Sequence, residues 1–304
     1  MDALIQSLVQ ANFAPERIAP QASMAQYTTL RIGGPAEVMV NIHSADEIAV
    51  ALRAAKQADA PVTIIGNGSN LLVRDGGIRG LVLRISGGLN AIRREGDCLL
   101  VQAGASLAAV AAFARDEGLS GMAELGGIPG TVGGGVLMNA GAYGAELAQL
   151  VTQAEGVSLS DGRRVIYPAD RLDFAYRHSA LMDAGVVITQ ATLALTPGAP
   201  EAIRARMEEC AKARREKQPL TLPSAGSTFK RPEGHFAAKL IDDCGLRGLT
   251  VGGAQVSEKH AGFIVNIGGA TARDMLELMR QVEQRVFEQT GVQLEPEVRI
   301  LGED

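Results

Sequence analysis

Hydrophobic and polar positions repeat with helical spacing in several parts of the chain. Apolar residues at this spacing follow Ser44 and Ser106, and each serine stands where a helix N-cap is expected. We therefore predict helices through about Gln57 and Asp116, the first opened by the capping box Ser44–Glu47. Further helices are predicted over residues 2–12, 199–217, 236–244 and 271–290.

Alternating patterns and short apolar runs predict the strands. They cover residues 28–32, 37–42, 62–65, 81–85, 91–94, 98–103, 152–159, 163–167, 186–195, 263–266 and 297–301. The chain becomes polar and rich in charge after the turn Pro197–Gly198, and we place a domain boundary near residue 200.

Glycine interrupts the pattern most strongly between Gly121 and Gly144, where it holds 9 of 24 positions. Glycine permits positive φ and lets bare main chain approach another group, so the useful atoms are N–H donors suited to a phosphate or pyrophosphate. Thr131 stands as the N-cap of a short helix within this stretch. A tight crossing of two backbones without a ligand is the alternative.

A second glycine-rich turn follows the predicted strand 62–65. Small residues and donors cluster here at Gly66, Gly68, Ser69 and Asn70. The turn is not a dinucleotide fingerprint, because Leu71 stands where the third glycine belongs. No glycine-lysine-Ser/Thr triplet of the Walker type occurs either. A nucleotide site in this chain is therefore of neither common kind.

Composition narrows the class of protein. The 304 residues are 46% hydrophobic and 21% charged with a net charge of -5, which argues against a nucleic-acid-binding protein. No run of 18 apolar residues and no signal peptide are visible, so neither a membrane span nor export is expected. The three cysteines form no C-x-x-C pair and the four histidines are dispersed, which favours a cytoplasmic protein without a metal site.

Polar residues in three short segments are candidates for chemistry. Arg177, within residues 174–179, carries a planar charge suited to a carboxylate or enolate, or it bridges to a surface acid. Ser227 lies in a loop bounded by prolines, where it either transfers a proton or only forms a turn. Acylation is disfavoured because there is no G-x-S-x-G elbow. Lys230, close by in sequence, is a point charge for phosphate or carboxylate.

The third segment is residues 293–300, in which Glu297 opens the last predicted strand. A carboxylate at a strand end beside the chain terminus is usually solvated. The basic residues Arg214 and Lys217 stand near the end of the predicted helix 199–217, where the helix dipole alone favours cations.

Together these segments resemble the UDP-N-acetylenolpyruvoylglucosamine reductase family, the flavoenzymes of bacterial peptidoglycan precursor synthesis. The matching pieces follow the family's order from about residue 25 to 300. They are residues 28–34, 66–72, 126–134, 139–143, 176–177, 225–232 and 295–298. Seven pieces in order are a specific signal.

The resemblance implies an α+β fold. An FAD-binding region of the para-cresol methylhydroxylase and vanillyl alcohol oxidase (PCMH/VAO) type, made of two α+β subdomains, is expected over residues 1–198, joined by the C-terminal strand 295–304. A substrate-binding α+β domain is expected over residues 199–294.

The resemblance also implies a reaction. NADPH reduces FAD, and the flavin N5 hydride passes to the enolpyruvyl group of UDP-N-acetylglucosamine enolpyruvate, giving UDP-N-acetylmuramate. The family's proton donor falls on Ser227, and its enolate-stabilising arginine and glutamate fall on Arg177 and Glu297. Glu297 must be protonated, or share a proton, to donate to the enolate oxygens.

Ligand contacts are carried over residue by residue. Those to FAD fall on Ile65, Gly66, Asn67, Gly68, Ser69, Asn70, Leu71, Gly127, Ile128, Pro129, Gly130, Thr131, Gly134, Asn139, Gly141 and Ala142. Those to the substrate fall on Tyr176, Arg214, Lys217 and Lys230. No histidine or cysteine lies in either glycine-rich stretch, so FAD is expected to be non-covalent. Only Thr-Pro-Gly-Ala-Pro separates Leu195 from the next helix, so the chain resembles the family's second type, which lacks the tyrosine loop.

Two alternatives stay open. One is another flavin enzyme of the same fold, such as a carbohydrate or alcohol oxidase, and the other is a flavin- or nucleotide-binding protein without reductase activity. The expected partners are small molecules, and a monomer is expected.

Overall fold

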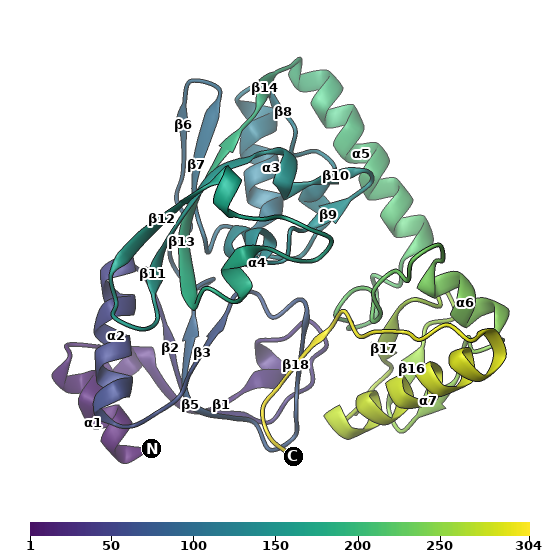
Figure 1. Ribbon diagram of the computed structural model, residues 1–304, viewed down its shortest axis with the longest axis horizontal. Helices are drawn as coiled ribbons and strands as arrows, with labels where there is room; N and C mark the ends of the chain where they lie inside the picture. The colour runs from purple at the N-terminus through teal and green to yellow at the C-terminus, as the bar shows by residue number, and fades with distance from the viewer. The chain divides into compact units, whose positions relative to one another are not determined.

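The computed structural model describes residues 1–304, and the chain folds as two compact units (Figure 1). Unit 1 consists of Met1–Pro20, Val38–Asn67 and Gly80–Ala213. Unit 2 consists of Gln21–Glu37, Gly68–Arg79 and Arg214–Asp304. The predicted division into domains 1–198 and 199–294, with the strand 295–304 joined to the first, stays a prediction.

A five-stranded antiparallel sheet forms the centre of unit 1, in the order β12-β11-β13-β7-β6. Its strands are β6 (Ile92–Glu95), β7 (Cys98–Gln102), β11 (Val151–Ser158), β12 (Arg164–Pro168) and β13 (Val186–Ala194). The short helices α3 (Leu107–Asp116) and α4 (Val132–Leu137) lie beside this sheet (Figure 1). Their inward residues, such as Leu107 and Val132, are fully buried in one apolar core.

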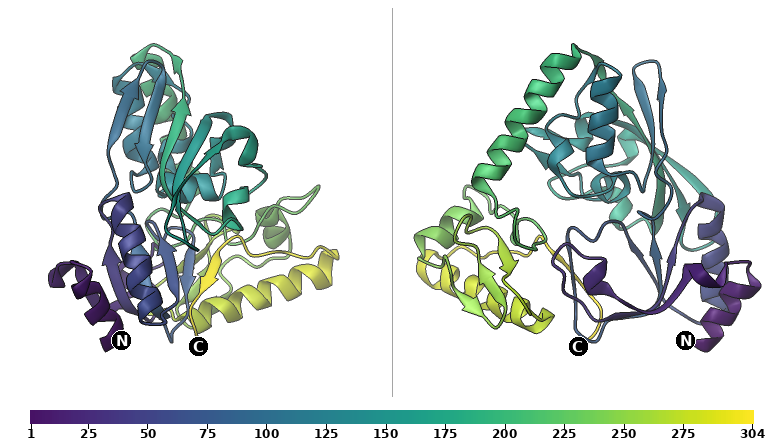
Figure 2. Two further views of the ribbon diagram at one scale, coloured as in Figure 1. Left: turned by 60° about the vertical axis from the view of Figure 1, so that its left-hand side comes forward. Right: turned by 180° about the vertical axis from the view of Figure 1, so that it is seen from behind.

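The helices α1 (Asp2–Gln10) and α2 (Ala45–Gln57) of unit 1 lie side by side (Figure 2). Their buried residues belong to the same apolar core as those of a four-stranded sheet in the order β1-β2-β5-β3. Its strands are β1 (Ile18–Ser23), β2 (Pro35–Asn41), β3 (Val62–Ile65) and β5 (Ile78–Arg84), and β3 pairs with β5 in parallel. The chain passes from one unit to the other within β1, β2 and β5.

The remaining strands and helix of unit 1 lie next to or within the glycine-rich stretch 121–144, or follow β13 in the chain. They are β8 (Leu119–Ser120), β9 (Gly141–Ala142), β10 (Ala145–Glu146), β14 (Thr196–Pro197) and α5 (Pro200–Lys217), whose last turn belongs to unit 2.

Unit 2 has its own apolar core, formed around the long amphipathic helix α7 (Ala272–Thr290). This helix packs against α6 (Ala237–Asp243) and a sheet of β15 (Thr250–Val251), β16 (Ala254–Val256) and β17 (Ile264–Asn266). The last strand, β18 (Arg299–Leu301), pairs in parallel with β4 (Leu71–Val73). A strand from the C-terminus is therefore paired with one from the first third of the chain.

The structure confirms the predicted helices, including both serine caps. Ser44 Oγ accepts from the Glu47 N–H at 3.3 Å, and Ser106 Oγ accepts from the Ala109 N–H at 3.1 Å. The capping box at Ser44 is only half formed, because the Glu47 carboxylate accepts from the His43 N–H and from Arg17.

The predicted strand at residues 28–32 is wrong. Thr28, Leu30 and Ile32 are buried in alternation as in a strand. The main chain instead folds on itself: Thr28 Oγ1 donates to the Ile32 carbonyl at 2.9 Å, and Arg31 has a φ of 55°. The alternating pattern therefore predicted correctly which side chains are buried, but it did not predict whether the segment pairs with another strand. The last strand also begins later than predicted, at Arg299 rather than Glu297.

Candidate active site

The two glycine-rich stretches lie against each other in unit 1. Gly66 follows the end of β3, and a Cβ added to it would lie 2.6 Å from Thr131 Oγ1. Asn67 Nδ2 donates to the Pro129 carbonyl at 3.1 Å. Two segments more than 60 residues apart in the sequence therefore join at one place, as a shared ligand requires.

Thr131 fixes the start of α4 at this meeting point. Its side chain is buried, and its Oγ1 accepts from the Gly134 N–H at 3.3 Å. The Gly130 carbonyl accepts from the Leu107 N–H at 3.1 Å, and the Val132 N–H donates to the Ala105 carbonyl at 2.8 Å. The main chain on both sides of Thr131 is thus held by the junction between β7 and α3.

Close packing explains some of the glycines in this stretch. A Cβ would lie 2.7 Å from Ala111 Cβ at Gly126, 2.9 Å from Ala103 Cβ at Gly133, and 2.8 Å from Leu147 Cδ1 at Gly135. At these three positions, close packing within the protein is enough to explain the glycine.

Packing does not explain Gly134. This residue is exposed, and the nearest atom to an added Cβ would be Thr131 Oγ1, at an ordinary 3.5 Å. The protein itself leaves room for a side chain there, so glycine at this position keeps the main chain bare toward the outside. A bare main chain beside Gly66 and Thr131 fits the pyrophosphate of FAD.

The second half of the first glycine-rich turn belongs to unit 2. Gly68 has a φ of +62°, and a Cβ there would lie 2.1 Å from the Tyr27 carbonyl oxygen. The Thr29 N–H donates to the Gly68 carbonyl at 3.2 Å. The segment 27–29, to which the sequence assigned no role beyond the family match at 28–34, therefore supports this turn.

Asn70 connects the same turn to the C-terminal segment. Its Nδ2 donates to the Glu297 carbonyl at 3.1 Å, and its own carbonyl accepts from the Arg299 N–H at 3.0 Å. Ser69 and Leu71 on either side are half-buried. An expected FAD contact and an expected catalytic residue are thus joined by a direct hydrogen bond.

Unit 2 also brings Ser227, Lys230 and Glu297 together. The Glu297 N–H donates to the carbonyl of Thr228 at 2.8 Å, and the Lys230 N–H donates to the carbonyl of Glu295 at 2.8 Å. Lys230 Nζ lies 3.2 Å from Glu295 Oε2. Ser227 is exposed at the surface of the loop, whereas Glu297 is half-buried.

The Ser227 loop is anchored through Thr228, which is buried. Thr228 Oγ1 accepts from the Ile264 N–H at 3.0 Å, and the Thr228 N–H donates to the Gly262 carbonyl at 2.9 Å. The Gly262 N–H in turn donates to Nδ1 of His260 at 3.2 Å. Burial lowers the pKa of His260, and the positive charge of Arg247 lowers it further.

Arg177 lies in unit 1, on a tight turn. The turn runs from Ala175 to His178, and Arg177 has a φ of 55°. Its guanidinium carbon lies 5.0 Å from the ring centroid of the exposed Tyr176, within cation–π range. The turn therefore presents an aromatic ring and a planar cation together.

Three expected FAD contacts lie just after α4. Asn139 is buried, with its Nδ2 donating to the Ala175 carbonyl at 3.1 Å and its Oδ1 accepting from the Ala148 N–H at 2.9 Å. Gly141 and Ala142 form β9 and are half-buried. The side chain of Asn139 is therefore engaged by the protein itself, a role that the sequence pattern did not predict.

The expected diphosphate ligands Arg214 and Lys217 lie in the last turn of α5. Arg214 is half-buried and Lys217 is exposed. Lys259 Nζ donates to the carbonyl of Arg215 at 2.5 Å and so closes this helix end. Both residues belong to unit 2, as Lys230 does, whereas Tyr176 belongs to unit 1.

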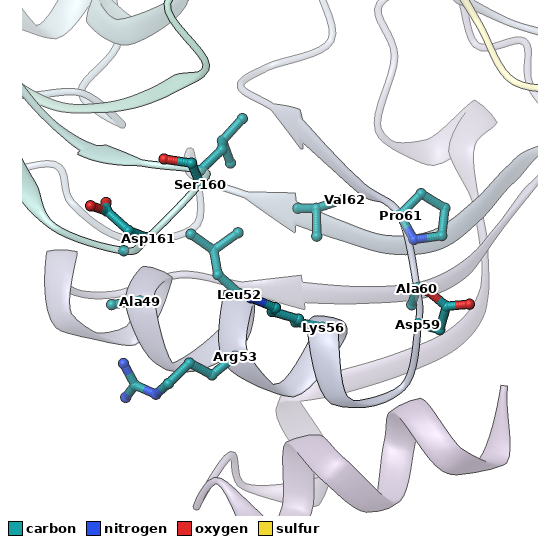
Figure 3. Close-up of a pocket in the computed structure, with 12 residues that line it drawn as sticks. Ala49, Leu52, Arg53, Lys56, Asp59, Ala60, Pro61, Val62, Ser160 and Asp161 are labelled. Carbon is teal, nitrogen blue, oxygen red and sulfur yellow. The ribbon is translucent and has the colours of Figure 1, made fainter.

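A separate groove of about 730 Å³ lies in unit 1, between α2 and the turn that joins β11 to β12 (Figure 3). Arg53 and Lys56 line it from the helix, and Ser160 and Asp161 line it from the turn. It contains none of the residues expected to bind FAD or substrate.

None of the helices combines the length and the apolar character that a membrane span needs. No group of three or more histidine, cysteine or acidic residues is placed where it could hold a metal ion.

Known proteins resemble this chain over nearly its whole length. The FAD binding domain family matches residues 36–166, and the C-terminal domain of UDP-N-acetylenolpyruvoylglucosamine reductase matches residues 218–301. The reductase of Pediococcus pentosaceus is 46% identical over 98% of this chain and 99% of its own. That of Agathobacter rectalis is 49% identical over 92% of each chain.

A solved structure extends the likeness to three dimensions. The crystal structure of UDP-N-acetylenolpyruvylglucosamine reductase from Thermus caldophilus is 38% identical, with a TM-score of 0.80, and covers 92% of this chain and 97% of that one. The α+β fold with an FAD-binding region and a C-terminal domain is thereby confirmed. By sequence and by fold, this chain belongs to the UDP-N-acetylenolpyruvoylglucosamine reductase family and is an FAD-dependent oxidoreductase.

Proposed function

We propose that this protein uses NADPH to reduce the enolpyruvyl group of UDP-N-acetylglucosamine enolpyruvate, giving UDP-N-acetylmuramate for peptidoglycan synthesis in the cytoplasm. The observation that carries the proposal is the meeting of the two glycine-rich stretches at Gly66 and Thr131, beside the bare main chain of Gly134. Membership of the reductase family supports the choice of substrate.

FAD, held without a covalent link, would supply the hydride chemistry, with NADPH as the source of electrons. The main chain of residues 66–70 and 127–131 would hold its pyrophosphate, since N–H groups of glycine-rich turns suit phosphate oxygens. The other residues proposed to contact it are Ile65, Leu71, Gly134, Asn139, Gly141 and Ala142. For Asn139 the contact would come from main-chain atoms, because its amide is bonded within the protein.

Residues of this chain stabilise the negative charge that develops on the substrate. Reduction of a double bond conjugated to a carboxylate makes an enolate, so negative charge develops on the carboxyl oxygens. Arg177 meets this charge with a fixed fork of N–H donors. Glu297, in its protonated form, donates to the same oxygens.

Ser227 then gives a proton to the neighbouring carbon. A serine is a weak acid, so its conjugate base needs a nearby cation. Lys230 stands three residues away, paired at 3.2 Å with an exposed Glu295. Exposed pairs of this kind are weak, so Lys230 can turn toward another anion at little cost.

The substrate diphosphate needs cations, because this chain lacks the tyrosine loop of the other type in its family. We propose Arg214, Lys217 and Lys230 as its partners and Tyr176 as a further substrate contact. In this view residues 1–198 bind FAD, with the strand 295–304 joined to them, and residues 199–294 bind the substrate.

The test follows NADPH and flavin absorbance with the purified protein. NADPH alone should bleach the flavin once, and sustained NADPH oxidation should require UDP-N-acetylglucosamine enolpyruvate. UDP-N-acetylglucosamine, which lacks the double bond, is the control. Reoxidation by dioxygen in preference to the substrate would indicate an oxidase, and flavin that NADPH leaves oxidised would indicate a binding protein.

A further inference from the structure

The turn that carries Arg177 is closed but strained. The Ala175 N–H donates to the His178 carbonyl at 3.1 Å, and the His178 N–H donates back to the Ala175 carbonyl at 3.2 Å. Arg177 is the second of the two residues between them, and its φ of 55° is one that turns normally give to glycine or asparagine. Strained conformations of this kind persist only where the surrounding structure holds them.

Two buried side chains hold the turn from either side. Asn139 Nδ2 donates to the Ala175 carbonyl at 3.1 Å, so this oxygen accepts two hydrogen bonds. On the other side, Ser179 Oγ donates to the Leu137 carbonyl at 2.8 Å. Asn139 is 1% exposed and Ser179 0%, so both bonds are protected from water.

Both bonds lead to the same short helix. Leu137 is the last residue of α4, and Asn139 follows two residues later. The N-cap of α4 is Thr131, beside Gly66. One helix of six residues thus has the proposed flavin contact at its first end and the Arg177 turn at its last.

The environment makes these bonds costly to lose. Leu172 and Leu181, on either side of the turn, are buried in the apolar core of unit 1. A buried hydroxyl or amide in such surroundings is unfavourable unless it is hydrogen-bonded. Satisfied, the two groups fix a unique arrangement of α4 and the turn.

We propose that Asn139 and Ser179 are positioning residues, which hold Arg177 at a set place relative to the flavin contact at the start of α4. The proposal rests on the proposed function, in which Arg177 stabilises the enolate. It adds that Asn139 and Ser179 act only by positioning Arg177, so neither side chain needs to touch FAD or substrate.

Ser179→Ala tests the proposal in the purified holoenzyme. Without this hydrogen bond Arg177 is less well positioned. Reoxidation of the reduced flavin by UDP-N-acetylglucosamine enolpyruvate should therefore slow about two- to tenfold. Reduction of the flavin by NADPH should stay within about twofold of the parent rate, because Arg177 takes no part in it. Stopped-flow absorbance measures both.

Thr189→Val is the matched control. Thr189 is also nearly buried, and its Oγ1 donates to the Glu155 carbonyl at 3.2 Å, between two strands of the same unit. This variant should lose thermal stability as Ser179→Ala does, while both half-reactions keep their rates. Equal slowing of reoxidation in Thr189→Val and Ser179→Ala would overturn the proposal.

A double substitution separates positioning from general damage. In an Arg177→Ala background there is no guanidinium left to position, so adding Ser179→Ala should slow reoxidation no further. An additional slowing of the same size as in the parent background would overturn the proposal.

Tryptic cleavage after Arg177 tests whether Asn139 and Ser179 hold the turn, and it does not depend on the catalytic reaction. The turn should be cut several times faster in Ser179→Ala and Asn139→Ala than in the parent or in Thr189→Val. If the parent protein fails to reduce the substrate, the proposed function is wrong. The cleavage rates still decide whether Asn139 and Ser179 hold the turn. Equal cleavage in all four proteins would show that they do not.

Discussion

The main-chain N–H of Glu297 donates to the carbonyl of Thr228 at 2.8 Å. This bond joins two segments about 70 residues apart and sets Glu297 beside the residue that follows Ser227. Because Thr228 is itself buried and bonded to Ile264, the whole arrangement has little freedom. A proposed proton donor and a proposed enolate-stabilising residue are thus held on one rigid support in unit 2.

Substitution of Ser227 should affect only one half of the reaction. A positioned general acid typically contributes about 10²–10⁴-fold, so Ser227→Ala should slow substrate reduction by an amount in this range. NADPH should still reduce the flavin at a near-normal rate. Ser227→Cys should keep part of the activity, because a thiol can also donate a proton.

Stopped-flow measurement of both half-reactions decides the role of Ser227. Ser160→Ala, an exposed serine of the β11–β12 turn, is the control and should change neither rate. Equal slowing of both half-reactions in Ser227→Ala, or slowing of neither, would remove Ser227 from the mechanism and leave its loop as a structural turn.

Arg177→Lys should be more harmful than an ordinary conservative change. Lysine keeps the charge but lacks the planar fork, so substrate reduction should slow on the order of tenfold or more while flavin reduction is nearly intact. The matched control is Arg164→Lys, which alters an exposed ion pair with Asp46 at 2.7 Å and should have little effect. A parallel loss in flavin reduction would make Arg177 a structural residue.

Three successive glycines of α4 should respond differently to alanine. Without FAD, Gly134→Ala should stabilise the protein by about 0.5–1 kcal/mol, because alanine favours a helix and its Cβ meets nothing closer than 3.5 Å. The same Cβ should weaken FAD binding about tenfold or more.

The neighbouring glycines serve as controls. Gly133→Ala and Gly135→Ala should destabilise the protein even without FAD, since their Cβ atoms would lie 2.9 Å and 2.8 Å from other side chains. Denaturant unfolding of the apoprotein and FAD titration by fluorescence measure the two effects. Unchanged FAD affinity in Gly134→Ala would place the pyrophosphate elsewhere.

His260 should make stability depend on pH. Burial, reinforced by the charge of Arg247, lowers the pKa of His260 below its ordinary value of 6.5. The unfolded chain then binds a proton that the folded chain does not, so stability falls as pH falls through about 6.5.

The substitution His260→Asn removes this titration. Asparagine Oδ1 can replace Nδ1 as the acceptor of the Gly262 N–H, which in the parent lies at 3.2 Å. Melting temperatures at pH 5, 6, 7 and 8 should therefore fall less steeply toward acid in the variant. Parallel curves for parent and variant would contradict the assignment.

The sequence alone predicted what depends on local forces. Helices such as α3 were placed to within a residue, because a serine cap and apolar residues at helical spacing are both local signals. The glycine-rich stretches and the polar residues Arg177, Ser227 and Glu297 also stood out in the sequence, because ordinary helices and strands have little use for them. Their resemblance to a known family then named the fold and the cofactor.

Only the tertiary structure decided which distant segments meet. The approach of Gly66 to Thr131, the link from Asn70 to Glu297 and the strain at Arg177 involve partners that no local pattern identifies. The same limit explains the false strand at 28–32, where burial alternates but no neighbouring strand offers pairing. Periodicity records which side chains avoid water, whereas strand pairing and site geometry depend on what the rest of the chain places beside them.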